Sequence, residues 1–197
     1  MIGMRGQSAY FSHDELVQIG FAHFGSNVRI SRKCSIYLPE QMKFGDNVRV
    51  DDFSILSGAI SFGSHIHVAA YTALYGGGEI ELHDFCNISS RVSIYSVSDD
   101  YSGETMTNPM VPEIYKRVER APVVLGKHVI VGSGAIILPG VTIGEGSAIG
   151  ALSLVTKKLD PWGVYAGIPV RRLRSRDQAL LKLEAEYLST IGPTKAE

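Results

Sequence analysis

The chain has few of the features that mark disulfide-stabilised or membrane-spanning proteins. It contains two cysteines among 197 residues. No uninterrupted apolar run approaches the roughly 18 residues that a membrane-spanning helix requires. The first residues, as far as Glu15, lack the apolar centre of a secretory signal peptide. We therefore expect a cytoplasmic protein without a membrane span.

Neither sign of charge is in excess. The chain has 19 Lys and Arg residues against 20 Asp and Glu residues, which gives a formal net charge of −1. A nucleic-acid partner drawn by a strong basic field is therefore not expected. With 45% hydrophobic residues and a length within the range of one domain, the chain can form one packed core.

What the chain does have is a repeat of six residues between Leu125 and Pro169. A small or aliphatic residue stands fifth in each hexad, and an aliphatic residue opens it: Leu125, Val131, Ile137, Ile143, Ile149 and Val155. A period of six does not match the 3.6-residue period of a helix. It matches a short strand followed by a turn, with two inward side chains per strand.

The same frame is present upstream. Hexads open at Phe24, Phe44, Phe62 and Leu82, at spacings of twenty, eighteen and twenty residues. Eighteen residues are three hexads, so each coil would have three flat faces and three corners. The longer coils would carry two extra residues at a corner, near Pro39 and in the run of glycines at 76–78. Stacked repeats bury one another's inner side chains, so the pattern predicts a three-sided β-solenoid.

The fifth position of each hexad is expected to point into the core. Upstream of residue 97 these positions hold Val28, Cys34, Val48, Ser54, Ile66, Thr72, Cys86 and Val92. Cysteine acts there as a small apolar residue, and the two cysteines lie several coils apart, so we expect no disulfide. A charge at Ile66 or Val92 should destabilise the coil. A change at the outward sixth position, as at Arg29, should be tolerated.

Both ends of the chain lie outside the repeat. Ser12 and Glu15 form a capping-box pattern, which predicts a short helix within an N-terminal cap of residues 1–23. The repeat itself occupies residues 24–169. The remaining residues, 170–197, should contain an amphipathic helix over 177–189 and a tail.

Residues 97–122 interrupt the repeat. A segment of this length without the frame is either functional or disordered in a compact domain. Its apolar side chains, among them Met106, Met110 and Ile114, argue against disorder. We therefore expect an ordered excursion loop.

The hexads and the segment Tyr165-Ala-Gly-Ile-Pro-Val-Arg-Arg resemble the hexapeptide-repeat acyltransferases, and within them the maltose, galactoside and polysaccharide O-acetyltransferases. The resemblance covers roughly residues 20–175. It implies an all-β fold, a left-handed parallel β-helix with short N-terminal and C-terminal helices and one long excursion loop. It also implies a homotrimer in which that loop packs on a neighbouring subunit. The left hand is taken from the family, because most crossovers are right-handed.

In this family the acyl donor, acetyl-coenzyme A, lies between adjacent coils. The resemblance implies contacts from the residues at the matching motif positions, which are Ser133, Ala151, Thr156, Lys157, Arg171 and Arg174. Ser133 and Ala151 match small outward positions beside the pantetheine arm. Coenzyme A carries several phosphate charges, with which Lys157 and the arginines would pair. No metal is expected.

The acceptor half of the site departs from the family. The maltose and galactoside enzymes have a general-base histidine at the start of the loop, where this chain has Asp99, and no histidine lies between 84 and 127. The position of a sugar-binding asparagine is Ala69. Two alternatives stay open for the catalytic group. Either His67 acts from a neighbouring subunit, or Asp99 or Asp100 acts, with a base contributing ~10²–10⁴-fold to the rate.

The sequence therefore predicts an acetyl-coenzyme A-dependent acetyltransferase of a sugar hydroxyl in surface polysaccharide or lipopolysaccharide biosynthesis. The missing histidine favours an alternative, N-acetylation of a nucleotide-linked amino sugar, because a neutral amine needs less help from a base. A non-catalytic β-helix for binding or assembly is the alternative from another class. A carbonic-anhydrase-like zinc site would need three converging histidines, which the spacing of His65, His67 and His83 does not provide.

Overall fold

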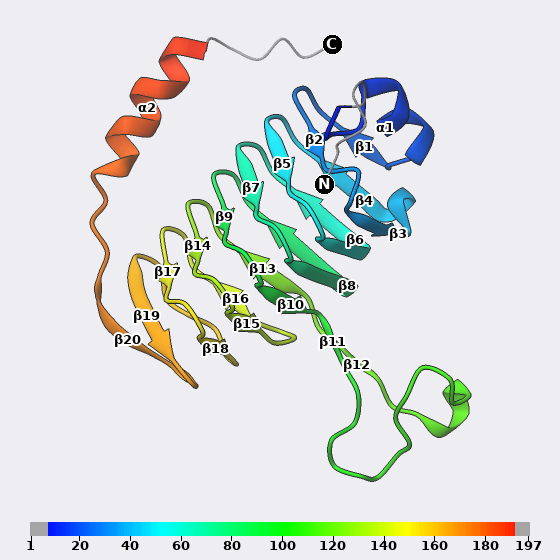
Figure 1. Cartoon of the computed structure of the whole chain (residues 1–197). Helices are drawn as coiled ribbons and strands as arrows, with labels where there is room; N and C mark the ends of the chain where they lie inside the picture. The colour runs from blue at the N-terminus through cyan, green and yellow to red at the C-terminus, as the bar shows by residue number, and fades with distance from the viewer. Residues whose placement is uncertain (1–7, 192–197) are drawn as a thin grey trace, which may run out of the picture.

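Short strands wind into a three-sided column in which each coil lies on the one before it (Figure 1). The computed structural model describes residues 8–191. Strands at equivalent positions of successive coils pair in parallel, as the pairing of Val48 with Ile66 and of Val50 with Val68 illustrates. The predicted left-handed parallel β-helix is confirmed.

Three faces make up the column. The first face comprises β2 (Arg29–Ile30), β5 (Val48–Val50), β7 (Ile66–Val68), β9 (Asn87–Ile88), β14 (Ile130–Val131), β17 (Ala148–Ile149) and β19 (Gly163–Gly167). The second face comprises β3 (Ser35–Tyr37), β10 (Ser93–Tyr95), β15 (Ile136–Ile137), β18 (Leu154–Val155) and the first halves of β6 (Ile55–Phe62) and β8 (Ala73–Leu82). The third face comprises β1 (His23–Phe24), β4 (Met42–Phe44), β13 (Val123–Leu125), β16 (Thr142–Ile143) and the second halves of β6 and β8.

The extra residues of the longer coils lie at the corner between the second and third faces. Pro39–Gln41 form the short 3-10 helix η1 there. Where β6 and β8 bend round this corner, Gly58 pairs with Gly76 and Ile60 pairs with Ile80, so β8 carries two additional residues. The corners predicted from the spacing of the hexads are therefore present.

The first and fifth residues of the hexads fill the interior. On the first face the inward column consists of Ile30, Val50, Val68, Ile88, Val131 and Ile149, each at most 3% exposed. Each fully buried aliphatic side chain contributes roughly 1.5–3 kcal/mol. Cys86 is buried and Cys34 is partly buried, both are free thiols, and burial raises the pKa of each to about 12.

The predicted N-terminal helix is confirmed as α1 (His13–Ile19). Ser12 is its N-cap, and the two reciprocal bonds of the capping box with Glu15 are both present. Gly20 ends the helix in the left-handed conformation, with φ of 84°. Glu15 also pairs with Arg32 of the first coil, so its pKa is lowered to about 2, and the cap is fastened to the column.

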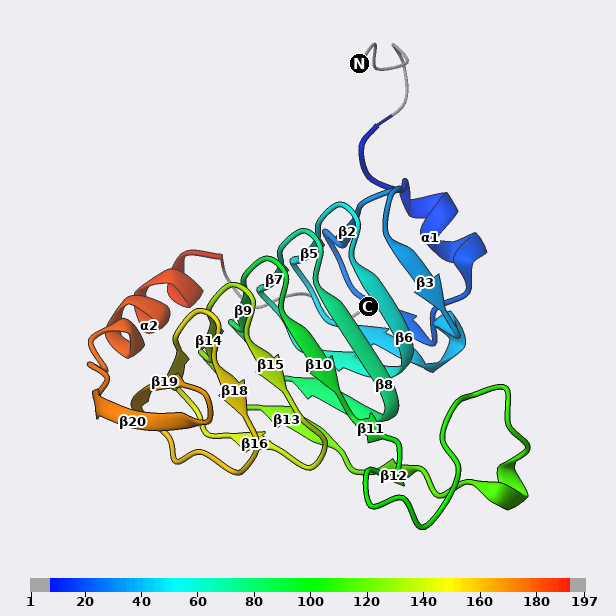
Figure 2. The same ribbon diagram turned by 60° about the horizontal axis from the view of Figure 1, so that its bottom comes forward.

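The excursion leaves the column after β10 and returns at β13 as an arm that projects away from the faces (Figure 2). Two features of this arm were not predicted. The segments β11 (Val97–Ser98) and β12 (Glu119–Arg120) pair in antiparallel fashion at its base, and η2 (Glu113–Tyr115) lies near its tip. The arm exposes Met110 and Ile114, which are 88% and 83% accessible.

After Pro169 the prediction of a helix without further strands was incomplete. Val170–Ser175 form β20, which turns back and pairs antiparallel with β19. The C-terminal helix α2 (Leu180–Ile191) begins three residues later than predicted, and residues 192–197 lie outside the described part. A strand that reverses onto its neighbour has no hexad signature, because its register is set by the turn.

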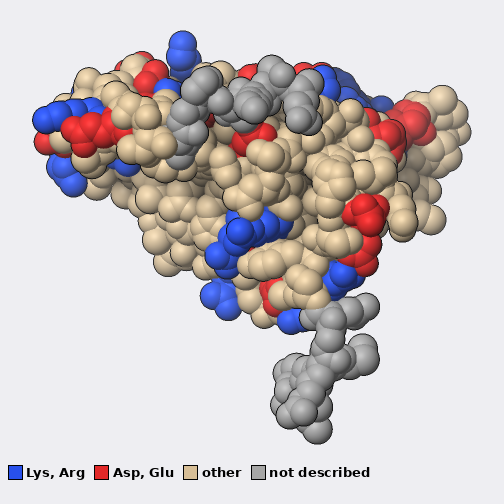
Figure 3. All heavy atoms as spheres, turned by 90° about the horizontal axis from the view of Figure 1, so that it is seen from above, with Lys and Arg blue, Asp and Glu red and all other residues tan. Residues whose placement is uncertain are grey.

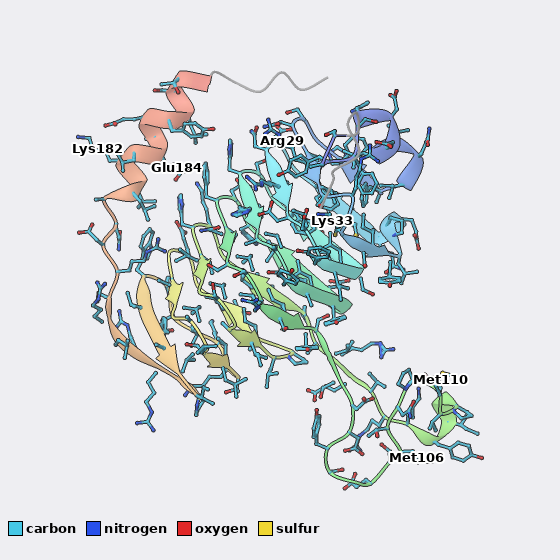
Figure 4. The ribbon with its side chains drawn as sticks, viewed as in Figure 1. Arg29, Lys33, Met106, Met110, Lys182 and Glu184 are labelled. Carbon is cyan, nitrogen blue, oxygen red and sulfur yellow. The ribbon has the colours of Figure 1, made fainter. Side chains whose placement is uncertain are left out.

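Arg176 fastens this C-terminal segment to the column. Its guanidinium donates hydrogen bonds to the carbonyl oxygens of His128 and Gly146 at 2.9 and 3.0 Å. Helix α2 then crosses the corner between the third and first faces, where Glu184 pairs with Lys127 and lies 2.8 Å from Nε2 of His128 (Figure 4). The segment that follows the repeat is therefore held by specific polar contacts.

On the face of the molecule that is seen from above (Figure 3), charged side chains lie in small groups. Figure 3, which views the molecule from above, shows basic and acidic groups separated by uncharged surface, with neither sign dominating. Between residues 8 and 191, no helix has the length and apolar character needed to cross a membrane.

Candidate active site

A basic pocket lies at the C-terminal end of the column. It has a volume of about 440 Å³ and is lined by Lys157, Lys158, Leu159, Asp160, Tyr165, Val170, Arg171 and Arg172. Four cationic side chains and one carboxylate thus line the pocket. Such a set of charge-assisted donors suits a ligand that carries several phosphate groups.

Two of the predicted cofactor contacts, Lys157 and Arg171, meet in this pocket. The sequence did not single out Lys158 and Arg172, which line it as well. Arg174 does not line it, and its guanidinium donates to the Ser175 carbonyl at 3.4 Å. The difference arises because β20 reverses on β19, so its register, which motif spacing does not show, decides which arginines face the pocket.

Ser133 and Ala151 lie at another place, the corner between the first and second faces. Both are exposed, as predicted, and they stand on successive coils. A Cβ atom on Gly132 would lie 2.5 Å from the backbone nitrogen of Ala151 on the next coil, so only glycine fits at position 132. Ser90 continues the line of small residues one coil earlier, with its Oγ 3.4 Å from that of Ser133. Thr156 is at the far edge of the second face, next to Lys157.

The start of the arm forms a second, polar pocket. It has a volume of about 370 Å³ and is lined by Ser98, Asp99, Asp100, Tyr101, Arg117 and Glu119. The two aspartates that the sequence singled out therefore line one pocket, together with two side chains of the returning limb that it did not. Three carboxylates and one guanidinium suit a ligand with amino and hydroxyl groups.

The two aspartates differ in their freedom to meet a ligand. The carboxylate of Asp100 accepts four hydrogen bonds, from the N–H and hydroxyl groups of Ser102 and Thr105, and these bonds hold its pKa well below the ordinary range. Its side chain is 4% exposed. Asp99 is exposed and its carboxylate has no such partners among the described residues. Of the two aspartates, Asp99 is therefore the one whose carboxylate is free to contact a ligand.

His67 lies on the first face, apart from both aspartates. Its Nε2 is 2.8 Å from Oδ2 of Asp51, whose other oxygen accepts from Nε of Arg49 at 2.6 Å. The side chain points outward between the buried Ile66 and Val68, as the hexad frame predicts. Within one chain, the structure does not bring His67 to the arm where Asp99 and Asp100 lie.

His65, His83 and His128 have other neighbours. His65 and His128 stack on the two sides of the Phe85 ring at the corner that α2 covers, and His83 pairs with Glu81 at 2.9 Å. In the part of the chain that the structure describes, no three His, Cys, Asp or Glu side chains converge as metal ligands would.

Comparisons with known proteins agree with this geometry. The model of the bacterial transferase hexapeptide family, six repeats, matches residues 122–157. An Escherichia coli dTDP-4-amino-4,6-dideoxy-D-glucose acyltransferase is 44% identical over 188 residues, which cover 93% of this chain and 98% of the relative. The chain belongs to the hexapeptide-repeat acyltransferases. It is an acyltransferase that uses acyl-coenzyme A, in agreement with the activity that the sequence resemblance implied.

Solved structures extend the likeness. A substituted variant of AntD, an N-acyltransferase from Bacillus cereus, crystallised with dTDP and coenzyme A, is 49% identical and superposes with a TM-score of 0.91 over 93% of this chain and all of AntD. The galactoside O-acetyltransferase of Escherichia coli K12 is 33% identical over 58% of this chain. The predicted family is confirmed, but the likeness to N-acyltransferases exceeds that to the O-acetyltransferase branch. The aspartate in place of the loop histidine agrees with this correction.

The basic pocket leads to a prediction about the acyl donor. Replacing Lys157 and Arg171 together by Gln should raise the KM for acyl-coenzyme A by about tenfold or more, since hydrogen bonds to charged groups contribute ~1.5–3 kcal/mol each. The kcat should change little, because binding is lost equally from ground and transition states. Lys43→Gln, an exposed change on the third face, is the control for steady-state kinetics. An unchanged KM in the double variant would contradict this assignment.

Proposed function

We propose that this enzyme transfers an acyl group from acyl-coenzyme A to the amino group of a dTDP-linked 4-amino-4,6-dideoxyhexose. The observation that carries the proposal is the 44–49% identity, over at least 93% of the chain, to N-acyltransferases associated with that sugar. One AntD structure holds dTDP-4-amino-4,6-dideoxyglucose and coenzyme A, and another holds 3-hydroxybutyryl-coenzyme A. Acetyl and hydroxybutyryl groups are therefore the acyl groups to test first.

The chemistry of the arm supports an amine acceptor. A neutral amine attacks a thioester without a strong base, whereas a sugar hydroxyl needs one. In the proposed reaction the nitrogen bonds to the thioester carbon, the carbon–sulfur bond breaks, and the nitrogen's proton ends on the departing sulfur. Asp99 would accept a hydrogen bond from the amine and stabilise the positive charge that nitrogen gains during attack.

The substitutions made in AntD add support for this role. Its structures include variants of a serine and of an aspartate ten residues apart. Here Ser89 precedes Asp99 by the same spacing, and Ser90 likewise precedes Asp100. Because the carboxylate of Asp100 is occupied by Ser102 and Thr105, Asp99 is the aspartate of these two pairs that is free to meet the acceptor.

The decisive experiment is an acceptor panel that follows coenzyme A release and product mass. The proposal expects turnover with dTDP-4-amino-4,6-dideoxyglucose and none with dTDP-6-deoxyglucose, which carries a hydroxyl in place of that amine. His67→Ala should keep kcat within a few-fold, because His67 is bonded to Asp51 on another face. Preferred turnover of the hydroxyl sugar would restore the O-acetyl alternative, and failure to bind coenzyme A would favour a non-catalytic module.

The proposal includes a homotrimer, for which the second face offers a surface. Side chains that follow one another on its outer side are uncharged, in one column Ser35, Ile55, Ala73, Ser93, Ile136 and Leu154, and in the next Tyr37, Ser57, Tyr75 and Tyr95. Together with exposed apolar side chains on the arm, this surface is of the kind that associating proteins cover. The proposed occupant of this surface is a second copy of the chain, because each copy carries both the uncharged face and the exposed apolar side chains of the arm.

The oligomer makes a testable prediction. Ile136 is 40% exposed on β15, the next-to-last strand of the second face. Ile136→Arg would place three charges in the proposed interfaces and should convert the trimer to monomers, as light scattering after gel filtration would measure. Circular dichroism should be unchanged, since the side chain points away from the core. A variant that stays trimeric, or a wild type that is monomeric, would refute this interface.

A further inference from the structure

The turn that begins the arm is organised by one side chain. Oδ1 of Asp100 accepts from the backbone N–H of Ser102 at 2.8 Å and from its hydroxyl at 2.6 Å. Oδ2 accepts from the backbone N–H of Thr105 at 3.0 Å and from its hydroxyl at 2.7 Å. A carboxylate that bonds to the backbone just ahead of it fixes a turn in the way that Asx turns do.

The same carboxylate links the outgoing limb of the arm to the returning one. The guanidinium of Arg117 lies 3.6 Å from Oδ2 of Asp100 and 3.1 Å from a carboxylate oxygen of Glu104. The side chain of Asp100 is 4% exposed although the arm itself projects from the column (Figure 2). Breaking the hydrogen bonds to a nearly buried carboxylate costs free energy, so the partners of Asp100 hold the turn in one arrangement.

Asp99 lies between this network and a second fixed segment. On its other side Ser98 pairs with Glu119, and Val97 pairs with Arg120, in the short antiparallel ladder of β11 and β12. The hydroxyl of Ser98 also donates to the backbone carbonyl of Asp99 at 3.1 Å. The backbone of Asp99 is thus fixed on both sides, while its own carboxylate remains exposed.

We propose that Asp100 is a positioning residue that presents the carboxylate of Asp99 to the acceptor amine. This inference rests on the proposed function, because it needs an amine that Asp99 contacts. The two adjacent carboxylates then have separate tasks, one held inside the turn and the other free. Asp100 stays ionised at working pH because the four hydrogen bonds lower its pKa, so it does not compete for the amine's proton.

A matched pair of variants tests this role. Thr105→Ser keeps both donors to Asp100, whereas Thr105→Val removes the hydroxyl and keeps the size of the side chain. Asp100→Asn replaces one of the two acceptor oxygens by an NH2 donor, so the bonds from Ser102 and Thr105 cannot all form, and it removes the attraction to Arg117. A displacement of about 1 Å in a reacting group can cost ~10²-fold, so we expect kcat to fall by roughly 10-fold in Thr105→Val and roughly 100-fold in Asp100→Asn. Thr105→Ser should stay within about twofold of wild type on the same scale.

The effect must pass through Asp99 to support the proposal. In the Asp99→Asn background, Asp100→Asn should lower kcat by less than about twofold further, since effects of residues that act as a unit are not additive. The KM for acyl-coenzyme A and the trimer mass should stay at wild-type values in all variants. A purely structural role would instead give additive losses, or equal rates for Thr105→Val and Thr105→Ser, and either result would overturn the inference.

The activity of the wild type distinguishes failure of the proposed function from failure of this inference. A wild type that releases no coenzyme A with any amino sugar overturns the proposed function and this inference together. A wild type that acylates the amino sugar, with Asp100→Asn equally fast, overturns the inference alone.

Discussion

Replacing Asp99 by Asn should lower kcat for acylation of the amino sugar about 100-fold, the loss found when one preorganised electrostatic contact to a transition state is removed. Asn has nearly the same shape and carries no charge. The carboxylate of Asp99 is exposed at the polar pocket of the arm, so its replacement leaves the packed core untouched. The loss should therefore appear in kcat and in kcat/KM for the acceptor.

The physical reason lies in the charge that develops on nitrogen. When a neutral amine attacks a thioester, the nitrogen becomes positive in the tetrahedral intermediate, and a nearby carboxylate stabilises it more than an amide does. Asp100 cannot replace Asp99, because its two oxygens are engaged by Ser102 and Thr105. No histidine lies between 84 and 127 to take over the role.

Steady-state kinetics with the acceptor amine will check this expectation. Glu113→Gln is the matched control, because it removes a carboxylate of the same arm whose partner is Lys116, at 2.8 Å. The control should keep wild-type rates, and the KM for acyl-coenzyme A should be the same in both variants. Equal kcat values for Asp99→Asn and wild type would show that this carboxylate does not contact the reacting amine.

Replacing Val92 by Asp should destabilise the fold by about 4 kcal/mol or more, through the lost burial of an aliphatic side chain and the burial of a carboxylate. Val92 is fully buried at an inward fifth position between Thr72 and Ala135 of the adjacent coils. The inward hydroxyl of Thr72 donates to the carbonyl of Ser89 on the next coil, at 3.1 Å. An ionised carboxylate cannot donate in this way, so it has no way to satisfy its charge there.

Two controls separate burial from charge. Val92→Thr introduces a hydroxyl that can donate as Thr72 does, and should cost about 1–2 kcal/mol. Arg29→Asp places the same carboxylate at an exposed sixth position and should change the free energy of unfolding by about 0.5 kcal/mol or less. Urea unfolding followed by circular dichroism will measure all three. A Val92→Asp variant as stable as Arg29→Asp would contradict the inward orientation of the fifth position.

The hexad frame sufficed to predict the column because every coil repeats the same local requirement. Two inward side chains per strand and a turn every six residues predict the stacked coils, although the left hand came from the family resemblance, and the predicted fifth positions are buried except Cys34, which is partly buried. The capping box of Ser12 and Glu15 is likewise a local signal, and α1 follows it. The hairpin of the arm and the strand β20 were missed, because they depend on where the chain returns.

Some features of the candidate site could likewise be predicted from local sequence, and others depend on how the chain folds back. Local sequence sufficed to predict the coil, to place Lys157 in the motif that the family resemblance links to the acyl donor, and to show that the loop lacks a histidine. That Arg172 joins Arg171 in the basic pocket, and that the carboxylate of Asp100 is held while that of Asp99 is free, became visible only in the folded chain. The reason is physical. A repeat fixes each residue's direction relative to its neighbours, whereas a pocket or a turn network is fixed by side chains that meet only after the chain has folded back.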